Sequence, residues 1–429
     1  MTFEIGLLFG TLFICLFIGV PIAISLGVSA LVAIYLGSTL PLGIITQKAF
    51  SSLDSFPLLA IPFFMLAGVL MGKGGVSKRL LDLASVLVGW MTGGLSMVTI
   101  VACMFFAAIS GSGPATVAAI GGFMIPAMIA KGYGKGFSAA VPAAAGSIGV
   151  IIPPSIPFVI YGVTASVSVG DMFIAGIIPG IVITVGLMIV AYFISKKRGY
   201  KPESVEKIKI REVLKAFNEA KWALFIPIII LGGIYGGIFS PTEAAVVAVV
   251  YAIIIGKFVY KELSWKGMYD SFLETVVINA TTMIIIGLSV SFAYFLNLEQ
   301  IPTAISEFLT NLTSNPFIIL LAINILLLIV GMFIDTISAV VILTPVLLPV
   351  AEAVGIDPIH FGVLLVANLA IGFVTPPLGV NLFVASTVGR VKFENIVSAV
   401  IPFILIMIVC LLIISYIPSL TLWLPSLTE

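Results

Sequence analysis

Hydroxyl side chains gather at four places in this chain where glycine or proline interrupts an apolar run. Backbone carbonyls freed by such interruptions, together with a few hydroxyls, are the oxygen ligands that Na⁺ takes in membrane proteins. The pattern therefore predicts alkali-cation sites. The alternative is that Ser and Thr bond their own backbone and that small residues allow close packing. The hydroxyl residues concerned are Ser110, Ser112, Thr116, Ser147, Ser155, Thr336, Ser338 and Thr375.

Two double prolines interrupt apolar runs at 149–158 (GVIIPPSIPF) and 372–381 (GFVTPPLGVN). Proline removes a backbone donor and pushes the preceding residue out of the helical region, so two in succession break a helix. The two stretches lie 223 residues apart, and the same offset superposes Pro126 on Pro349. The chain therefore contains an internal duplication. Broken helices in corresponding positions of two repeats indicate the binding site of a transporter.

The composition predicts an all-α polytopic membrane protein. Hydrophobic residues make up 61% of the chain and charged residues 9%, and the mean hydropathy is +1.28. A soluble domain could not bury that much apolar surface. The net charge of +1 argues against a nucleic-acid partner, and the three cysteines lie in separate apolar spans, which favours packing over a disulfide framework. Apolar spans of about 20 residues are expected near 3–19, 21–37, 53–72, 137–168, 172–195, 222–238, 240–257, 269–297, 360–389 and 396–418.

Two further apolar stretches, about 86–130 and 316–354, are interrupted by small or polar residues near their middles. Each is either two spanning helices or a hairpin that enters and leaves by one face with its tip buried in protein. If both are hairpins, nineteen of the twenty Lys and Arg residues share one side of the membrane and only Lys48 lies on the other. The positive-inside rule makes the crowded side cytoplasmic, so the hairpin arrangement is favoured.

This arrangement predicts two inverted repeats. The first spans 1–195 and contains the broken helix 137–168; a cytoplasmic linker follows over 196–221, and the second repeat spans 222–429 and contains the broken helix 360–389. Both termini then face outward. The segment 258–273 is expected to be a helix that lies at the cytoplasmic interface.

Asp335 is the carboxylate of the interrupted regions. An ionisable group at membrane depth is a functional candidate by default. It could equally cap the returning helix of the second hairpin, and the two roles are compatible.

Five motifs in order resemble the large membrane subunit of tripartite ATP-independent periplasmic (TRAP) transporters, and the resemblance covers nearly the whole chain. They are SGSGPAT at 110, GVIIPPSIPFVIYG at 149, GGIFSPTEAA at 236, GMFIDTISA at 331 and GFVTPPLGVN at 372. The resemblance implies an elevator-type ion-transporter fold. It also implies a secondary active transporter rather than an enzyme, which uses Na⁺ as coupling ion and no other cofactor.

The same resemblance implies import of an organic acid anion across the bacterial inner membrane, with both termini periplasmic. Sialic acids and C4-dicarboxylates are among the family's substrates, and sialic acid is slightly favoured. Two partners are implied: a small four-helix membrane subunit, expected as a separate chain, and a periplasmic substrate-binding protein. The alternative is a self-sufficient Na⁺/dicarboxylate symporter of the same superfamily that needs no binding protein.

The resemblance also assigns sites, residue by residue, to the two tips and the two breaks. The first Na⁺ site would comprise Ser110, Gly111, Ser112, Gly113, Gly149, Ile152 and Pro153. The second would comprise Gly331, Asp335, Thr336, Ser338, Gly372, Thr375 and Pro376. Substrate would lie near Ser112, Ser155, Asp335, Thr336 and Asn381. Because Leu378 replaces Ser155 in the second break, the two halves of the substrate site cannot be chemically equivalent.

Overall fold

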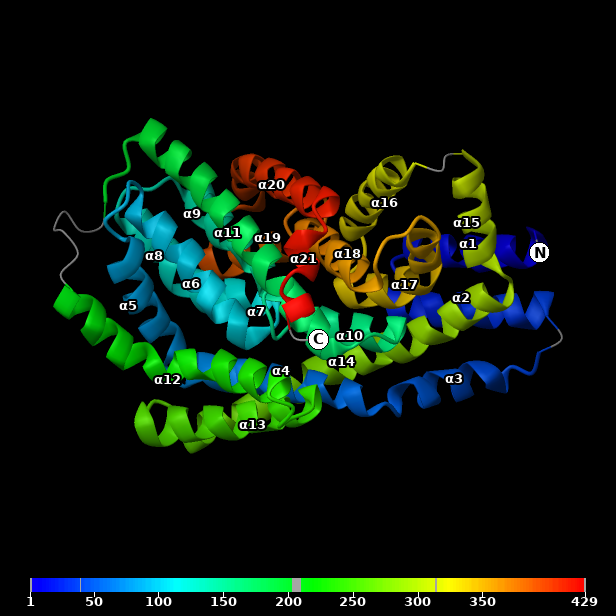
Figure 1. Cartoon of the computed structure of the whole chain (residues 1–429), viewed down its shortest axis with the longest axis horizontal. Helices are drawn as coiled ribbons and strands as arrows, with labels where there is room; N and C mark the ends of the chain where they lie inside the picture. The colour runs from blue at the N-terminus through cyan, green and yellow to red at the C-terminus, as the bar shows by residue number, and fades with distance from the viewer. Residues whose placement is uncertain (1, 39, 203–209, 313–314, 428–429) are drawn as a thin grey trace.

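A computed structural model describes residues 2–38, 40–202, 210–312 and 315–427. These residues form helices and no strand, and they build an elongated bundle (Figure 1). The helix α1 (Thr2–Phe17) lies at one end, and the end of α11 (Val169–Arg198) and the start of α12 (Ile210–Tyr235) lie at the other. Eight of the described helices are long and apolar enough to cross a membrane, judged by length and composition. The prediction of an all-helical, polytopic membrane protein is therefore confirmed.

The first five helices precede the first hairpin. They are α1 (Thr2–Phe17), α2 (Ile22–Gly37), α3 (Gly43–Leu53), α4 (Ala60–Lys73) and α5 (Val76–Val88). A short 3-10 turn, Phe56–Leu59, joins α3 to α4, so the apolar run expected over 53–72 begins with this turn. The helix α3 was not expected from the sequence.

The segment 94–130 forms a helical hairpin. It consists of α6 (Gly94–Ser110), α7 (Gly113–Thr116), one π-helical stretch (Val117–Gly121) and α8 (Gly122–Ala130). The chain reverses at Gly111, whose φ of +60° is a left-handed conformation that glycine adopts without steric cost. We call residues 110–116 tip 1.

The first broken helix follows as α9 (Lys135–Gly146), a 3-10 turn (Ser147–Val150) and α10 (Ile156–Ala165). The double proline lies in the non-helical residues 151–155, which we call break 1 together with Gly149. Ser155 begins the helix again, because its side chain accepts the N–H of Phe158 as an N-cap. The long α11 (Val169–Arg198) then runs back along the hairpin (Figure 1).

The expected linker 196–221 is largely helical in its described part. The helix α11 continues to Arg198, and α12 (Ile210–Tyr235) already begins at Ile210; residues 203–209 lie outside the described residues. The motif GGIFSPTEAA proves to be a helix start, since Ser240 and Glu243 form a reciprocal capping box for α13 (Pro241–Ile254).

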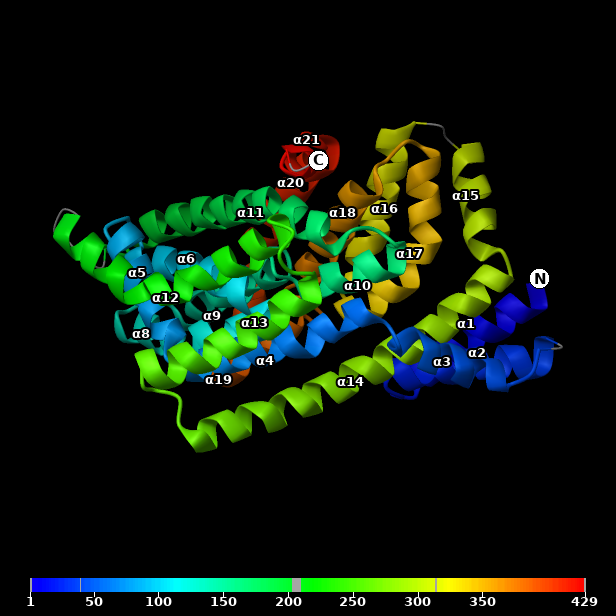
Figure 2. The same cartoon turned by 60° about the horizontal axis from the view of Figure 1, so that its bottom comes forward.

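The prediction of a helix over 258–273 was wrong in its bounds, because residues 261–264 are not helical. Ser264 caps a single continuous helix, α14 (Trp265–Leu298), which runs diagonally along one face of the molecule (Figure 2). No proline or glycine break separates the amphipathic start of this segment from its apolar continuation, so the helix propagates through both. The amphipathic α15 (Ile301–Leu312), which follows, was not expected either.

The second hairpin consists of α16 (Pro316–Gly331) and α17 (Thr336–Ala353), joined by residues 332–335. We call residues 331–338 tip 2. The second broken helix consists of α18 (Pro358–Gly372) and α19 (Val380–Gly389), with residues 372–379 as break 2. The chain then closes with α20 (Phe393–Tyr416) and the short α21 (Ser419–Leu422).

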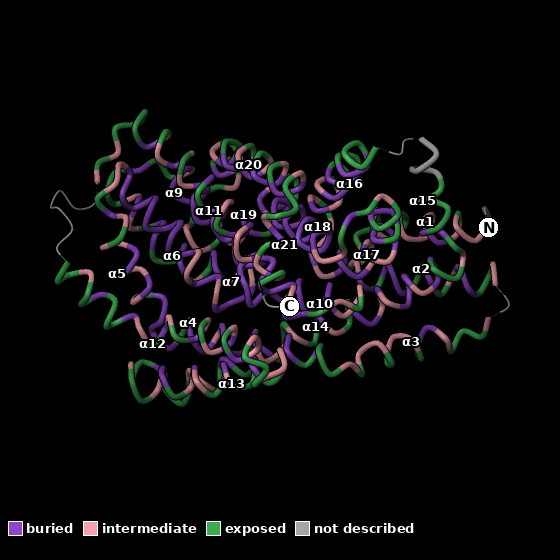
Figure 3. Tube along the Cα trace, viewed as in Figure 1, coloured by how far each residue is buried: buried purple, intermediate pink, exposed green. Residues whose placement is uncertain are grey.

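The two broken helices interlock the two halves of the chain. Each begins beside the hairpin of its own half, since α9 packs on α6 and α18 packs on α16. Each then ends against the other half, since α10 packs on α17, and α19 packs on α9 and on the π-helical stretch of the first hairpin. These crossing segments form the most buried part of the molecule (Figure 3).

Candidate functional site

Tip 1 gathers hydroxyl and carbonyl oxygens into one small polar group. The hydroxyls of Ser110 and Thr116 lie 2.8 Å apart, and Thr116 also donates to the carbonyl oxygen of Ser112 at 2.8 Å. Ser110 and Thr116 are buried, whereas Ser112 is half-buried, and its own hydroxyl has no hydrogen-bond partner in the described part of the chain. The tip therefore presents one free hydroxyl.

Break 1 packs directly onto tip 1 through two glycines. A Cβ placed on Gly149 would lie 2.6 Å from the carbonyl oxygen of Ser112 and 2.7 Å from the hydroxyl oxygen of Thr116. A Cβ on Gly111 would lie 2.7 Å from the carbonyl oxygen of Pro154. The structure therefore brings the residues expected for the first Na⁺ site together, and their oxygens converge where no side chain fits.

Besides the glycines, Ile152 and Pro153 of the expected set can contribute only backbone oxygens. The side chain of Ile152 packs against Gly180 on α11, and Pro153 is buried in the break. Gly113 lies close to Phe373 of break 2, to Asn381 of α19 and to the carbonyl oxygen of Gly146, so tip 1 contacts both broken helices there.

Tip 2 is organised by the carboxylate of Asp335. Its Oδ1 accepts the N–H groups of Ile337 at 3.0 Å and Ser338 at 3.1 Å, and its Oδ2 accepts the Ser338 hydroxyl at 2.5 Å. Asp335 is thus the N-cap of α17 in the structure. The neighbouring Thr336 hydroxyl oxygen is buried and has no hydrogen-bond partner, which is a costly arrangement unless something occupies the site.

Break 2 meets tip 2 through Gly372 and Gly331. A Cβ on Gly372 would overlap the carbonyl group of Gly331 and lie 2.7 Å from its Cα, so the backbones approach too closely for any side chain. Thr375 donates to the carbonyl of Ile371 at 2.7 Å, and the adjacent Pro376 is half-buried. A small cavity of about 30 Å³ is lined by tip 2 and break 2 together, with Asp335 among its walls.

Ser155 and Asn381, both expected near substrate, are fully buried. Ser155 donates to the carbonyl of Val150 at 2.5 Å. The amide nitrogen of Asn381 donates to the carbonyl of Ala143 at 3.1 Å and to the Ser147 hydroxyl at 3.3 Å. The amide oxygen of Asn381 has no partner, so a residue of the second half leaves an unsatisfied acceptor inside the first half.

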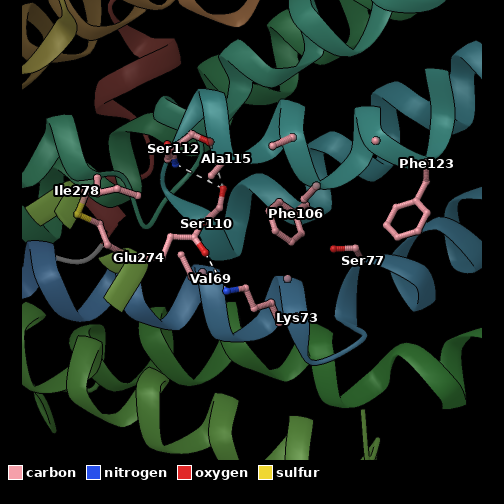
Figure 4. Close-up of a pocket in the computed structure, with 16 residues that line it drawn as sticks. Val69, Lys73, Ser77, Phe106, Ser110, Ser112, Ala115, Phe123, Glu274 and Ile278 are labelled. Carbon is pink, nitrogen blue, oxygen red and sulfur yellow. Dashed lines mark hydrogen bonds and ion pairs between the residues drawn. The ribbon is translucent and has the colours of Figure 1, made fainter. Parts of the chain in front are cut away.

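A larger cavity of about 490 Å³ opens beside tip 1 (Figure 4). Ser110 and Ser112 line one side of it, and α4, α5 and α14 form the other. Across from the tip, the ammonium group of Lys73 forms an ion pair with Glu274 at 2.9 Å. Ser77 also lines the cavity. The residue is 2% exposed, and its buried hydroxyl oxygen has no hydrogen-bond partner among the described residues.

Of these expected substrate residues, Ser112 lines the cavity. Ser155 and Asn381 are buried elsewhere and do not line it. Sequence reasoning missed Lys73, Ser77 and Glu274 as site residues. The sequence analysis counted Lys73 only among the cations of one membrane face. The one feature that could have identified it as a cavity residue is its position as the last residue of an apolar helix. Glu274 comes from α14, 201 residues further along the chain, and nothing in the spacing pairs it with Lys73.

The sequence profile of the family described as "Tripartite ATP-independent periplasmic transporter, DctM component" matches residues 9–420. The chain belongs to this family. The prediction of a TRAP large subunit is thus confirmed, and so is the expectation of a transporter component rather than an enzyme.

Three relatives illustrate the range of the family. The chain is 52% identical to the isethionate TRAP transporter permease protein DctMQ of Oleidesulfovibrio alaskensis, over 97% of this chain and 65% of that protein, so it spans about two-thirds of that relative. It is 42% identical to the C4-dicarboxylate TRAP transporter large permease protein DctM of Pseudomonas aeruginosa, over 94% of both chains. It is 40% identical to the sialic acid TRAP transporter large permease protein SiaM of Vibrio cholerae, over 99% of this chain and 98% of that one.

The fold also resembles that of the Alcanivorax borkumensis YdaH transporter, whose crystal structure is described as having an unusual topology. The TM-score is 0.65 over 89% of this chain and 90% of that one, at 14% sequence identity. At that identity the likeness concerns the fold alone.

Proposed function

We propose that this subunit imports a small organic anion by Na⁺ symport, with the interlocked hairpins and broken helices moving as one body in an elevator mechanism. The observation that carries the proposal is the close contact between each hairpin tip and its helix break. Gly149 of break 1 lies against tip 1, and Gly372 of break 2 lies against tip 2. Unsatisfied carbonyls at such breaks are costly in a membrane unless a ligand fills them.

Na⁺ would be carried as cargo at these two contacts. At the first, the carbonyl of Ser112 and the hydroxyls of Ser110 and Thr116 already converge within hydrogen-bond distance of one another. At the second, the unpartnered Thr336 hydroxyl and the Asp335 carboxylate supply oxygen and negative charge. Equivalent elements in the two halves favour two ions, carried in two inverted repeats.

The anion would occupy the cavity beside tip 1. It offers one ammonium group from Lys73, the free hydroxyl of Ser112 and the buried, unpartnered hydroxyl of Ser77. These donors suit an oxyanion, and an arriving anion would compete with Glu274 for Lys73. One cation with two hydroxyls suits a single anionic head better than two separated carboxylates.

Among the named relatives, the isethionate transporter component shares 52% identity with this chain, against 42% and 40% for the dicarboxylate and sialic acid components. We therefore put a small monoanionic sulfonate first and sialic acid, which the sequence reading favoured, after it. The subunit would work in the bacterial inner membrane, with both termini periplasmic. Its partners would be a small four-helix membrane subunit and a periplasmic binding protein that delivers the solute.

The test uses proteoliposomes holding this chain with the small membrane subunit, supplied with radiolabelled isethionate, a C4-dicarboxylate or sialic acid. Uptake of one solute is expected only with an inward Na⁺ gradient and the matching binding protein. Equal uptake without any binding protein would favour the self-sufficient symporter instead. Uptake that is indifferent to Na⁺ would refute the ion sites.

The cavity has its own test in the same vesicles. Lys73→Gln should raise the solute concentration for half-maximal uptake at least about tenfold, the loss of one charge-assisted contact of ~1.5–3 kcal/mol. Lys78→Gln is a matched control, because Lys78 lies five residues further along the chain, on α5, is exposed and does not line the cavity. An unchanged half-maximal concentration in Lys73→Gln would remove the cavity from the solute path.

A further inference from the structure

A second polar cavity, of about 440 Å³, lies at the end of the molecule where α11 ends. It is formed where the turn after α8 meets the end of α11. Its walls carry three cationic side chains and two tyrosines. These are Lys131, Tyr133, Arg198, Tyr200 and Lys201.

The cavity has a firm wall on the tyrosine side. The Tyr200 ring stacks on Tyr133 with centroids 4.1 Å apart, and its hydroxyl accepts the N–H of Gly134 at 2.9 Å. The backbone of Tyr200 is also fixed, since its carbonyl accepts the N–H of Gly93 at 3.2 Å. The Tyr200 hydroxyl therefore keeps its own proton available for a ligand, because no acceptor for it is found among the described residues.

The charge of the cavity is uncompensated within the described part of the chain. Lys131, Arg198 and Lys201 form no ion pair with a described carboxylate. No acidic side chain lines the cavity with them. Three cations and one hydroxyl donor around a single space are suited to a phosphate-sized anion.

An apolar ridge leads along α11 toward this cluster. Ile181, Val185, Ile189 and Phe193 follow one another at four-residue spacing and are between 46% and 63% exposed. The next position of the series is Lys197, which is adjacent to Arg198 in sequence. A free phosphate needs only the cationic end, whereas a lipid needs an apolar track that ends at a charged group.

We propose that this cavity binds the phosphate headgroup of an anionic phospholipid, with an acyl chain lying along the α11 ridge. The charge division of the sequence places this end of the molecule at the cytoplasmic leaflet, where anionic lipids attract basic pockets between helices. The lipid would tie the end of the first hairpin to the end of α11. This inference does not depend on the transported solute or on the ion sites.

The experiment measures lipid retention by native mass spectrometry and thermal unfolding of the purified full chain. Phosphatidylglycerol, phosphatidylcholine and inorganic phosphate are added separately. Phosphatidylglycerol should be retained at least tenfold more tightly than phosphatidylcholine, with inorganic phosphate giving little stabilisation. If each cation contributes about fivefold, the variant Lys131→Gln/Arg198→Gln/Lys201→Gln should lose about a hundredfold.

A control variant, Lys215→Gln/Lys261→Gln/Lys266→Gln, removes three cations outside the cavity and should retain phosphatidylglycerol like the parent chain. If the triple cavity variant does not fold, Lys201→Gln alone provides the test, because Lys201 lies beyond the end of α11 and its substitution leaves the helix intact. This single variant should weaken retention about fivefold. Equal stabilisation by inorganic phosphate would assign the site to a free anion and overturn the lipid proposal. Unchanged retention in both cavity variants, or no preference over phosphatidylcholine, would overturn it as well.

Discussion

The contact between Gly372 and Gly331 gives the sharpest test of the second ion site. A methyl group on Gly372 would meet only backbone, 2.7 Å from the Cα of Gly331 and in collision with its carbonyl group. Backbone cannot rotate away as a flexible side chain can, so Gly372→Ala must push tip 2 and break 2 apart by roughly 1 Å, an overpacking cost of ~1–3 kcal/mol. If Na⁺ bridges the two segments, the Na⁺ concentration for half-maximal uptake should rise roughly 5- to 150-fold.

Gly331→Ala and Gly232→Ala calibrate this effect. A Cβ on Gly331 would lie no closer than 3.3 Å to its neighbours, and one on Gly232, in α12, meets nothing within 4 Å. We therefore expect a large effect at Gly372, a small one at Gly331 and none at Gly232, where alanine should add helix stability. Na⁺ titration of uptake, with folded protein measured by fluorescence-detected size exclusion, provides the comparison. A Gly372→Ala transporter that folds and keeps the parent Na⁺ dependence would refute an ion site at this contact.

Three further predictions concern topology, charge movement and Asp335. In a variant without native cysteines, Thr303→Cys should react with an impermeant thiol reagent added outside spheroplasts and Lys215→Cys should not; the reverse labelling would contradict the inverted topology. Two Na⁺ carried with a monoanion move one net charge, so an inside-negative potential of 100 mV, worth ~2.3 kcal/mol per charge, should raise solute accumulation about forty-fold. The potential is imposed on proteoliposomes with valinomycin and K⁺, and a solute level that does not respond to it would contradict that stoichiometry. Asp335→Asn preserves the helix cap but removes a charge that would stabilise a bound cation about 4 Å away by ~1–4 kcal/mol. The Na⁺ concentration for half-maximal uptake should therefore rise at least about fivefold, and an unchanged concentration would place the ion elsewhere.

The sequence predicted the fold where strong local signals act. The double prolines and Gly111 determine where helices end, because proline lacks the backbone donor and glycine tolerates a left-handed turn. The broken helices expected over 137–168 and 360–389 are helical over 135–165 and 358–389, each with its break inside, whereas the first hairpin begins at Gly94 and not near 86, where α5 still continues. The weaker signals did not suffice. The expected interfacial helix is the first part of α14, and α15 was not predicted. An amphipathic pattern does not indicate where it ends and a neighbouring apolar helix begins.

The close approaches of tip and break could be predicted from the sequence, whereas the side chains that line the large cavity could not. Glycine and proline mark the close approaches of tip and break along the chain itself, so Gly149 and Gly372 could be selected without a structure. Lys73 and Glu274 face each other only because α4 and α14 pack together, a contact that no periodicity within either segment encodes. The same holds for Asn381, whose amide reaches the first half of the chain.

The duplication also conceals a chemical difference that bears on mechanism. Ser112 and Asp335 are equivalent under the 223-residue offset, and both precede the returning helix of a hairpin. The carboxylate of Asp335 is held by two backbone N–H groups and a hydroxyl, whereas the Ser112 hydroxyl caps nothing and faces the large cavity. Under the proposed function the two halves would therefore divide the work. Tip 1 would offer the solute a free donor, and the fixed negative charge of Asp335 would make tip 2 the half that selects a cation.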